Sequence, residues 1–301
     1  MPGGGGICSS PSCHMLYHIP ECNGIRFQCR SSYLQGVTRI MYSVTSRIKS
    51  IKQPRGGYIK PSSFEQINME DQGRLNPVEN VPPTTMGMAV DYLTRFAMGA
   101  PVRKAFEISL KGAAIKSEYW DKNANTDADE YLDGIKGLDD ESIINACKMV
   151  AFDVWYRNPN SIIFGGATDT DGIEPDQDTI DNIRTMVNRS ISFFEKYGPV
   201  TVDGFTFEPD GYTKTVSAGD GDFLTEDTLW DFKVSKNKPT TQHTLQLLMY
   251  WIMGQHSGKP EYKNITKIGI FNPRLNVVYL LDMGNVSKET ITEVEDDVIC
   301  Y

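Results

Sequence analysis

Apolar residues recur at helical spacing through the middle of the chain. The pattern predicts a helix from Thr84 to Gly99, and Pro101 opens a second helix that reads "VRKAFEISLKGAAI". A third helix reads "ESIINACKMVAFDVWYRN" and ends before Pro159, and a fourth reads "DQDTIDNIRTMVNRSISFFEKYG". The stretch 122–140 is acidic, and we expect it to form an exposed loop.

From Pro199 onward the pattern changes to apolar and polar residues that alternate between Gly, Asp and Asn turns. This alternation indicates about three strands. A strong helix is expected from Thr241 to Gly254, followed by a hairpin that turns at 272–274, and Ser287 can cap a last helix. This order predicts one α/β (α+β) domain with a mostly antiparallel sheet and a helical N-terminal half.

Residues 1–80 show no sustained period, and we predict that residues 1–60 form a poorly ordered leader before a single domain at 61–301. Because thiolates and imidazoles are zinc ligands, the cysteines and histidines of the leader leave a zinc site open as an alternative. Their spacing lacks the paired C-x-x-C pattern of a strong zinc motif, which favours disorder. The cysteines of the leader are Cys8, Cys13, Cys22 and Cys29.

Charge is distributed unevenly along the 301 residues. The whole chain has a net charge of −9, yet residues 1–60 contain eight Arg or Lys and one acid, a balance of +7 that leaves −16 for the rest. A basic arm on an acidic body is compatible with phosphate contact, and also with a solvated tail. The longest apolar run has seven residues, Leu247 to Met253, whereas a membrane span needs about 20. We therefore predict a cytoplasmic protein without a membrane partner.

Charged residues interrupt an apolar stretch that reads "GDGDFLTEDTLWDFKVSK" at 219–236. A turn centred at 226–227 pairs the apolar residues with one another and places Asp222 opposite Asp231, with Cβ atoms roughly 5 Å apart. Lys233 follows Asp231 by two positions and therefore shares its face of the strand. Two opposed carboxylates repel, so Lys233 or a divalent cation such as Mg²⁺ has to compensate for their charge.

The helix that begins at Thr241 carries a polar stripe on an otherwise apolar surface. Gln242, Gln246 and Tyr250 follow one another at intervals of four residues and share one face. We expect this face to border a cleft at the edge of the sheet. His243 is adjacent to the stripe, and a structural role is expected for it rather than a catalytic one.

Together, Gly219-x-x-Asp222, Asp231-Phe232-Lys233 and Gln246-x-x-x-Tyr250 resemble the GxxD…DxK…QxxxY signature of the PD-(D/E)XK nuclease superfamily. The closest branch is the RecB-like and lambda-exonuclease-like one. The resemblance covers residues 200–285 as a core and implies a restriction-endonuclease-like fold. It extends loosely to "MGMAVDYLTRF", where Asp91 stands at the position of the family's early histidine; Glu107 is the other candidate for an early acidic ligand.

The resemblance implies a Mg²⁺- or Mn²⁺-dependent deoxyribonuclease, an exonuclease that acts on DNA in recombination, repair or phage DNA processing, and it leaves an oligomer open. Lys233 would orient or help deprotonate the attacking water, and Gln246 and Tyr250 would maintain the site or contact DNA. Asp222, Asp231 and the main-chain carbonyl of Phe232 would bind the metal. The substrate contacts implied are Ser235, Lys236 and Gln242.

Two other functions are compatible with the same residues. The departure at Asp91 allows a nuclease-fold protein that binds DNA or acts as a scaffold without catalysis. A sugar-processing carboxylate pair is the third option, with its two carboxyls about 5–9 Å apart, but it has no use for a lysine beside them.

Overall fold

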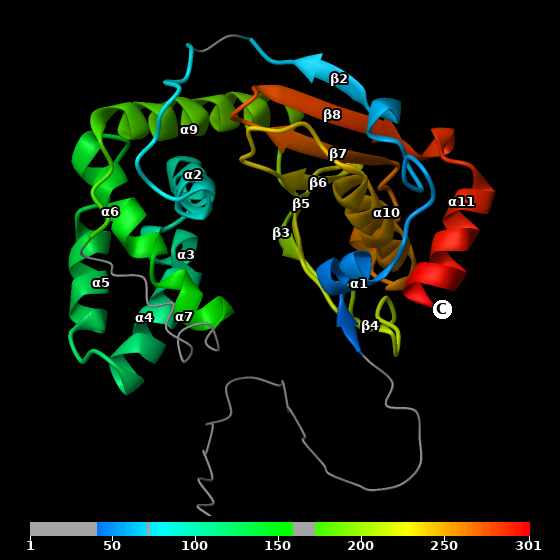
Figure 1. The fold of residues 1–301 in the computed structure, drawn as a ribbon, viewed down its shortest axis with the longest axis horizontal. Coiled ribbons are helices and arrows are strands. Elements are labelled where there is room, and N and C mark those ends of the chain that lie inside the picture. The colour runs from blue at the N-terminus through cyan, green and yellow to red at the C-terminus, as the bar shows by residue number, and fades with distance from the viewer. Residues whose placement is uncertain (1–40, 71–72, 159–171) are drawn as a thin grey trace, which may run out of the picture. The chain divides into compact units, whose positions relative to one another are not determined.

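The computed structural model describes residues 41–70, 73–158 and 172–301 (Figure 1). The predicted leader therefore lies outside the described residues up to position 40, and so does the zinc alternative. The described chain has the α+β fold class expected from the sequence: helices and a mixed sheet, with the strands concentrated after residue 200. None of the helices in the described segments is long and apolar enough to span a membrane.

A six-stranded sheet of order β2-β8-β7-β6-β5-β3 forms the centre of the fold. All neighbouring strands are antiparallel except β6 and β7, which are parallel. The predicted hairpin is β7 and β8, with its turn at 273–276. The strands are β2 (Glu65–Asn68), β3 (Val202–Phe205), β5 (Gly221–Leu224), β6 (Thr228–Phe232), β7 (Lys267–Asn272) and β8 (Val277–Asp282).

Helices cover both faces of this sheet, as the alternation of its side chains requires. Helix α10 (Thr241–His256) packs against one face through Leu248 and its apolar neighbours. On the other face, Phe193 of α9 (Gln177–Tyr197) stacks on Phe271 at 4.2 Å and meets Trp230 edge-on at 5.0 Å. Side chains that alternate along β6 therefore belong to two different cores.

A second group of helices packs around its own apolar core, which α2 and α9 share (Figure 1). Asp139 and Asp176 cap the helices that follow them, each by accepting a hydrogen bond from the backbone. The helices of this group other than α9 are α2 (Pro83–Ala97), α3 (Val102–Ala105), α4 (Glu107–Tyr119), α5 (Ala124–Asp133), α6 (Asp140–Val150) and α7 (Asp153–Arg157).

The second and third predicted helices are each divided in two. Phe106 leaves helical geometry between α3 and α4 and is fully buried, with its ring 5.4 Å from that of Tyr92. The other break, at 151–152, lies against α4. A Cβ on Gly112 would be only 1.9 Å from the carbonyl oxygen of Phe152, so the absence of a side chain allows α4 to approach the break.

The prediction of an exposed loop at 122–140 is wrong, because α5 lies within it. Ala124, Ala128 and Leu132 recur every four residues and are buried against the helical core. Of the acids of α5, Asp129, Glu130 and Asp133 are exposed, and Asp127 is half-buried. The many charged residues of this stretch suggested a loop in the sequence, although the stretch contains a short amphipathic helix.

The domain also begins earlier in the chain than the predicted boundary at residue 61. Strand β1 (Tyr42–Ser43) pairs with β4 (Val216–Ala218), and α1 (Val44–Ser50) packs against α10. Val44, Ile48 and Ile59 are buried in the core around α10. These contacts join residues far apart in the chain, so no local period reveals them. Near the C-terminus, Ser287 caps α11 (Lys288–Glu293) as predicted, and a π-helical turn (Val294–Ile299) follows.

Candidate functional site

The hairpin of β5 and β6 has the register that the sequence predicts. Phe223 pairs with Trp230 and Leu224 with Leu229. One step further out, the carboxylate oxygen Oδ2 of Asp222 accepts a hydrogen bond of 2.6 Å from the main-chain amide of Phe232, next to Asp231. The two strands therefore bring Asp222 and Asp231 together where β6 ends.

Asp231 is a buried carboxylate that is only partly compensated. Its residue is 4% exposed, and its oxygen Oδ1 forms an ion pair of 3.0 Å with the Nζ atom of Lys233. The other oxygen, Oδ2, is buried and has no hydrogen-bond partner among the described residues. Because a buried acceptor without a partner costs about 1–3 kcal/mol, and more when charged, this oxygen would be stabilised by a cation that bound to it.

The electrostatics of the pair follow from burial and from mutual repulsion. Burial, followed by the charge of Asp231, raises the pKa of Asp222 from 3.8 to about 7, although Lys233 and the Phe232 amide oppose the rise. Burial opposes the charge of Lys233, but the carboxylates of Asp231 and Asp222 outweigh burial and raise the pKa of this lysine. Without a metal, the site therefore contains a protonated lysine and a carboxyl that is readily protonated.

Helix α10 supplies two of the predicted residues to this site. The Nε2 atom of Gln246 donates a hydrogen bond of 2.9 Å to the hydroxyl of Tyr250, whose residue is 3% exposed. Burial raises the pKa of Tyr250 above its ordinary value, and Asp231 and Asp222 add to the rise, so the phenol lies near the carboxylates and stays protonated.

The first turn of α10 has a different arrangement. The side chain of His243 accepts a hydrogen bond from the Thr240 amide in a capping box, which agrees with the structural role expected for it. Gln242 lies in the same turn and is exposed. Gln242 is therefore available to a partner but is not part of the buried polar pair that Gln246 and Tyr250 form.

The two candidates for an early acidic ligand lie in different surroundings. Asp91 of α2 lies near enough to Asp222 for its charge to help raise the pKa of Asp222. Glu107 begins α4 on the surface and pairs with Lys104 and Lys111, whose hydrogen bonds hold the pKa of Glu107 at about 2. The structure thus brings Asp91, and not Glu107, toward the aspartates of the hairpin.

Asp91 also forms an ion pair with Arg95, so Asp222 is not its only charged neighbour. The Nε atom of Arg95 lies 3.0 Å from a carboxylate oxygen of Asp91, and the same guanidinium pairs with Asp203 of β3. This cluster is a feature that the sequence reading missed; the spacing of Asp91 and Arg95, four residues on one helix, was the available signal. The contact with Asp203 joins residues 108 positions apart and has no sequence signal.

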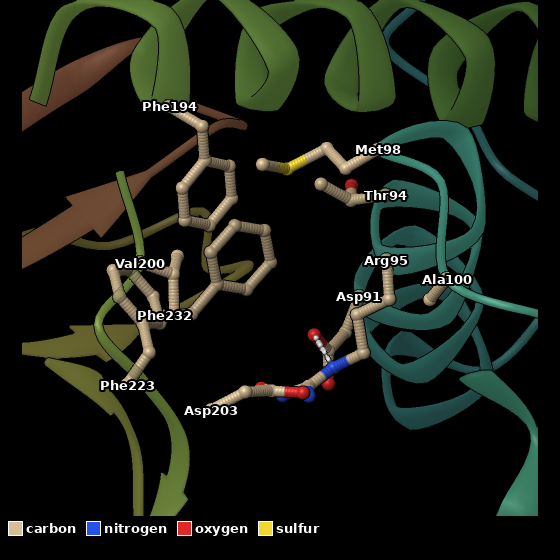
Figure 2. Close-up of a pocket in the computed structure, with 10 residues that line it drawn as sticks. All are labelled: Asp91, Thr94, Arg95, Met98, Ala100, Phe194, Val200, Asp203, Phe223 and Phe232. Carbon is tan, nitrogen blue, oxygen red and sulfur yellow. Dashed lines mark hydrogen bonds and ion pairs between the residues drawn. The ribbon is translucent and has the colours of Figure 1, made fainter. Parts of the chain in front are cut away.

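These residues border a pocket of about 170 Å³ between α2 and the sheet. Figure 2 shows aromatic side chains on the sheet side of the pocket, with Asp91 and Arg95 on the side of α2. Phe232, whose main chain meets Asp222, contributes its ring to this pocket. Asp222 and Asp231 do not line the pocket. Because side chains alternate along a strand, the ring of Phe232 lies on the opposite face of β6 from the side chain of Asp231.

The segment after β6 is held by contacts within the protein. The main-chain carbonyl of Ser235 accepts a hydrogen bond of 2.8 Å from Asn272, and its hydroxyl accepts one from the amide of Asn237. Lys236 is largely exposed, and its Nζ atom lies 3.4 Å from an oxygen of the buried Glu79. Ser235 and Lys236 thus lie in a fixed loop that leads from Lys233 to α10.

The donor set can be tested against a metal ion. In residues 41–70, 73–158 and 172–301, no three or more His, Cys, Asp or Glu side chains are grouped closely enough to hold one. Two carboxylates do meet, and one of their oxygens is buried without a partner. Hard oxygen ligands of this kind suit Mg²⁺, which keeps several waters and requires only one or two carboxylates from the protein. The two aspartates therefore fit Mg²⁺ or Mn²⁺.

Comparison of the chain with protein-family models, with curated proteins and with solved structures finds no match.

Proposed function

We propose that this protein is a divalent-metal-dependent deoxyribonuclease of the PD-(D/E)XK type, acting as an exonuclease on DNA in recombination, repair or phage DNA processing. The observation that carries the proposal is the buried Oδ2 atom of Asp231, which has no partner among the described residues although it adjoins Asp222. When both carboxyls are ionised, the buried Asp231 and the half-buried Asp222 beside one ammonium leave one negative charge uncompensated. A divalent cation would compensate for it.

Asp222, Asp231 and the main-chain carbonyl of Phe232 would hold Mg²⁺ or Mn²⁺. When bound, the metal would polarise the scissile phosphate and lower the pKa of a water molecule. The hydrogen bond from the Phe232 amide orients the carboxylate of Asp222 and leaves its second oxygen outside that bond. Binding would therefore require little rearrangement of this side chain.

Lys233 would act as a positive charge beside the reacting phosphate. Its pKa is raised despite burial because two carboxylates face it, so it is an ammonium when the metal is absent. In this form it donates hydrogen bonds and stabilises charge that develops on phosphate oxygens. The Gln246–Tyr250 pair would maintain the wall of the site from α10, while Ser235, Lys236 and Gln242 would contact the substrate.

The test is cleavage of end-labelled DNA with Mg²⁺ or Mn²⁺ by the wild type and by Lys233→Ala. We expect the variant to lose at least about 100-fold in rate, as is typical when a group that stabilises transition-state charge is removed. Lys267→Ala is the matched control, because Lys267 forms a comparable ion pair of 2.7 Å with Asp227 at the other end of the hairpin. Cleavage by Lys233→Ala at the wild-type rate would contradict the proposed role.

A second candidate function is a nuclease-fold protein that binds DNA or acts as a scaffold without cleaving it. The observation that favours it is the engagement of Asp91 by Arg95, which leaves two rather than three acids at the site. In that case, the wild type would bind DNA but would show no cleavage with any divalent metal. The same assay therefore separates the two functions.

A further inference from the structure

A basic segment connects α1 to β2, and we call residues 52–60 the basic strap. It reads "KQPRGGYIK", and its cations Lys52, Arg55 and Lys60 are all exposed. The chain has a net charge of −9, yet residues 42–64 contain five Arg or Lys and no acid. Among the described residues, none of the three strap cations has an ion-pair partner, so their charges face solvent uncompensated.

The strap is fixed to the domain by its other residues. Ile59 is buried in the core around α10, and Tyr58 packs against the same core. The hydroxyl of Thr244 donates a hydrogen bond of 2.7 Å to the carbonyl of Ile59. Its apolar side chains thus point inward while its cations point outward.

Gly57 determines how closely the strap approaches α10. It has a φ of +84°, and a Cβ at this position would lie 2.8 Å from the Cβ atom of Thr241. Only glycine combines this backbone conformation with so close an approach. The strap is therefore in direct contact with the first turn of α10.

This contact places the strap beside the carboxylate site. The loop 233–240 leads from Lys233 at the end of β6 to that same first turn of α10. Burial, followed by the charge of Lys233, lowers the pKa of His243, which indicates that Lys233 lies close to this turn. Lys238 of the loop is exposed and reaches Gln66 of β2, the strand that follows the strap (Figure 1). The exposed cations of this loop and those of the strap therefore lie at the same end of the fold.

We propose that the basic strap binds backbone phosphates of a nucleic acid strand and guides it into the site formed by Asp222, Asp231 and Lys233. The destination of the strand rests on the proposed function, whereas the phosphate contacts do not. Exposed Lys and Arg at intervals of a few residues suit a regular chain of phosphates, and binding needs no base recognition. An anionic membrane is a poorer fit, because the apolar side chains that would insert into it are packed in the core.

The test is equilibrium binding of a fluorescein-labelled oligonucleotide, single-stranded or duplex, by the full chain in EDTA. Anisotropy is measured between about 50 and 200 mM NaCl, and the slope of log K against log salt is compared. The triple variant Lys52→Ala/Arg55→Ala/Lys60→Ala is expected to reduce the magnitude of this slope by about 2 to 3, since each phosphate contact contributes roughly 0.7 to 0.9. A circular dichroism spectrum confirms that the variant is folded.

A control triple removes the same charge from exposed lysines elsewhere and is expected to leave the slope unchanged. The conservative pair Lys52→Arg/Lys60→Arg is expected to retain the wild-type slope. Equal slopes for the strap and control triples, or no binding by the wild type at any salt, would overturn the proposal. The control triple is Lys122→Ala/Lys263→Ala/Lys288→Ala.

Failure of the strap proposal can be distinguished from failure of the proposed nuclease function. If the wild type binds through the strap but does not cleave DNA with any divalent metal, the nuclease proposal fails and the strap is supported. If DNA is cleaved with the expected dependence on Lys233 but the strap triple leaves the slope unchanged, the strap proposal fails alone.

Discussion

The two carboxylates of the hairpin should destabilise the folded protein when no metal is bound. Replacing Asp222 with a neutral residue should therefore stabilise it. Burial and the neighbouring charge of Asp231 raise the pKa of Asp222 from 3.8 to about 7. A rise of this size corresponds to roughly 4 kcal/mol of destabilisation when the carboxyl is ionised in the folded state. Relaxation of the site and entry of water reduce the effect. We therefore expect Asp222→Asn to stabilise the protein by roughly 1–3 kcal/mol at about pH 8 in EDTA.

The dependence on pH has a defined sign. Between about pH 4 and pH 7 the folded state binds more protons at Asp222 than the unfolded state, so the wild type gains stability as the pH falls through this window. The advantage of Asp222→Asn should therefore shrink by about half or more when the pH falls from about 8 to 5. The retained amide oxygen of Asn can still accept the hydrogen bond from Phe232.

The assay is urea unfolding followed by tryptophan fluorescence at both pH values. Asp227→Asn in the turn of the same hairpin is the control. Burial opposes ionisation there too, but the hydrogen bonds from Lys267 and Thr228 and the charge of Lys267 together outweigh it and lower the pKa of Asp227, so this substitution should not stabilise the protein. If Asp222→Asn destabilised the protein equally at both pH values, the reasoning about the buried pair would be refuted.

Further predictions concern metal binding and packing. Mg²⁺ or Mn²⁺ should raise the thermal midpoint of the wild type but not of Asp222→Asn, which differential scanning calorimetry can measure, because a ligand that binds only the folded state stabilises it. Gly221→Ala should destabilise the protein by at least about 2 kcal/mol in urea unfolding, since the new Cβ would lie 1.9 Å from the ring of Phe205. Gly137→Ala is the control. A Cβ on Gly137 would lie 3.6 Å from its nearest neighbour, so this substitution should change stability by less than about 0.5 kcal/mol. Asp153→Ala should cost roughly 2–6 kcal/mol in the same assay, because it leaves the buried hydroxyls of Tyr92 and Ser109 without the carboxylate that accepts hydrogen bonds from both, at about 1–3 kcal/mol each. No loss of stability would contradict this role of Asp153.

Strong local patterns predicted a large part of the fold. Helix α9 was predicted because the acids of its first turn, its apolar period and Gly198 all agree, and β7 with β8 because alternation and a turn coincide. The register of β5 and β6 was predicted because only one pairing matches Phe223 with Trp230.

The remaining features depend on contacts that local patterns do not encode. The helix α5 was missed because acids outnumber its three small or apolar buried residues. Residues 42–60 were assigned to a leader because the partners of Ile59 lie on α10, far along the chain. At the site, the sequence predicted the meeting of Asp222 and Asp231. It could not predict that Arg95 binds both Asp91 and Asp203, because that contact depends on how α2 packs beside the sheet.

The central claim is that Asp222 and Asp231 bind one divalent cation, and a crystal soaked in Mn²⁺ tests it most directly through anomalous scattering. We predict an anomalous peak between the two carboxylates, with an oxygen of each about 2.1–2.2 Å from the ion. A well-ordered hairpin with no peak between these carboxylates, or with the only peak elsewhere on the protein, would contradict the account.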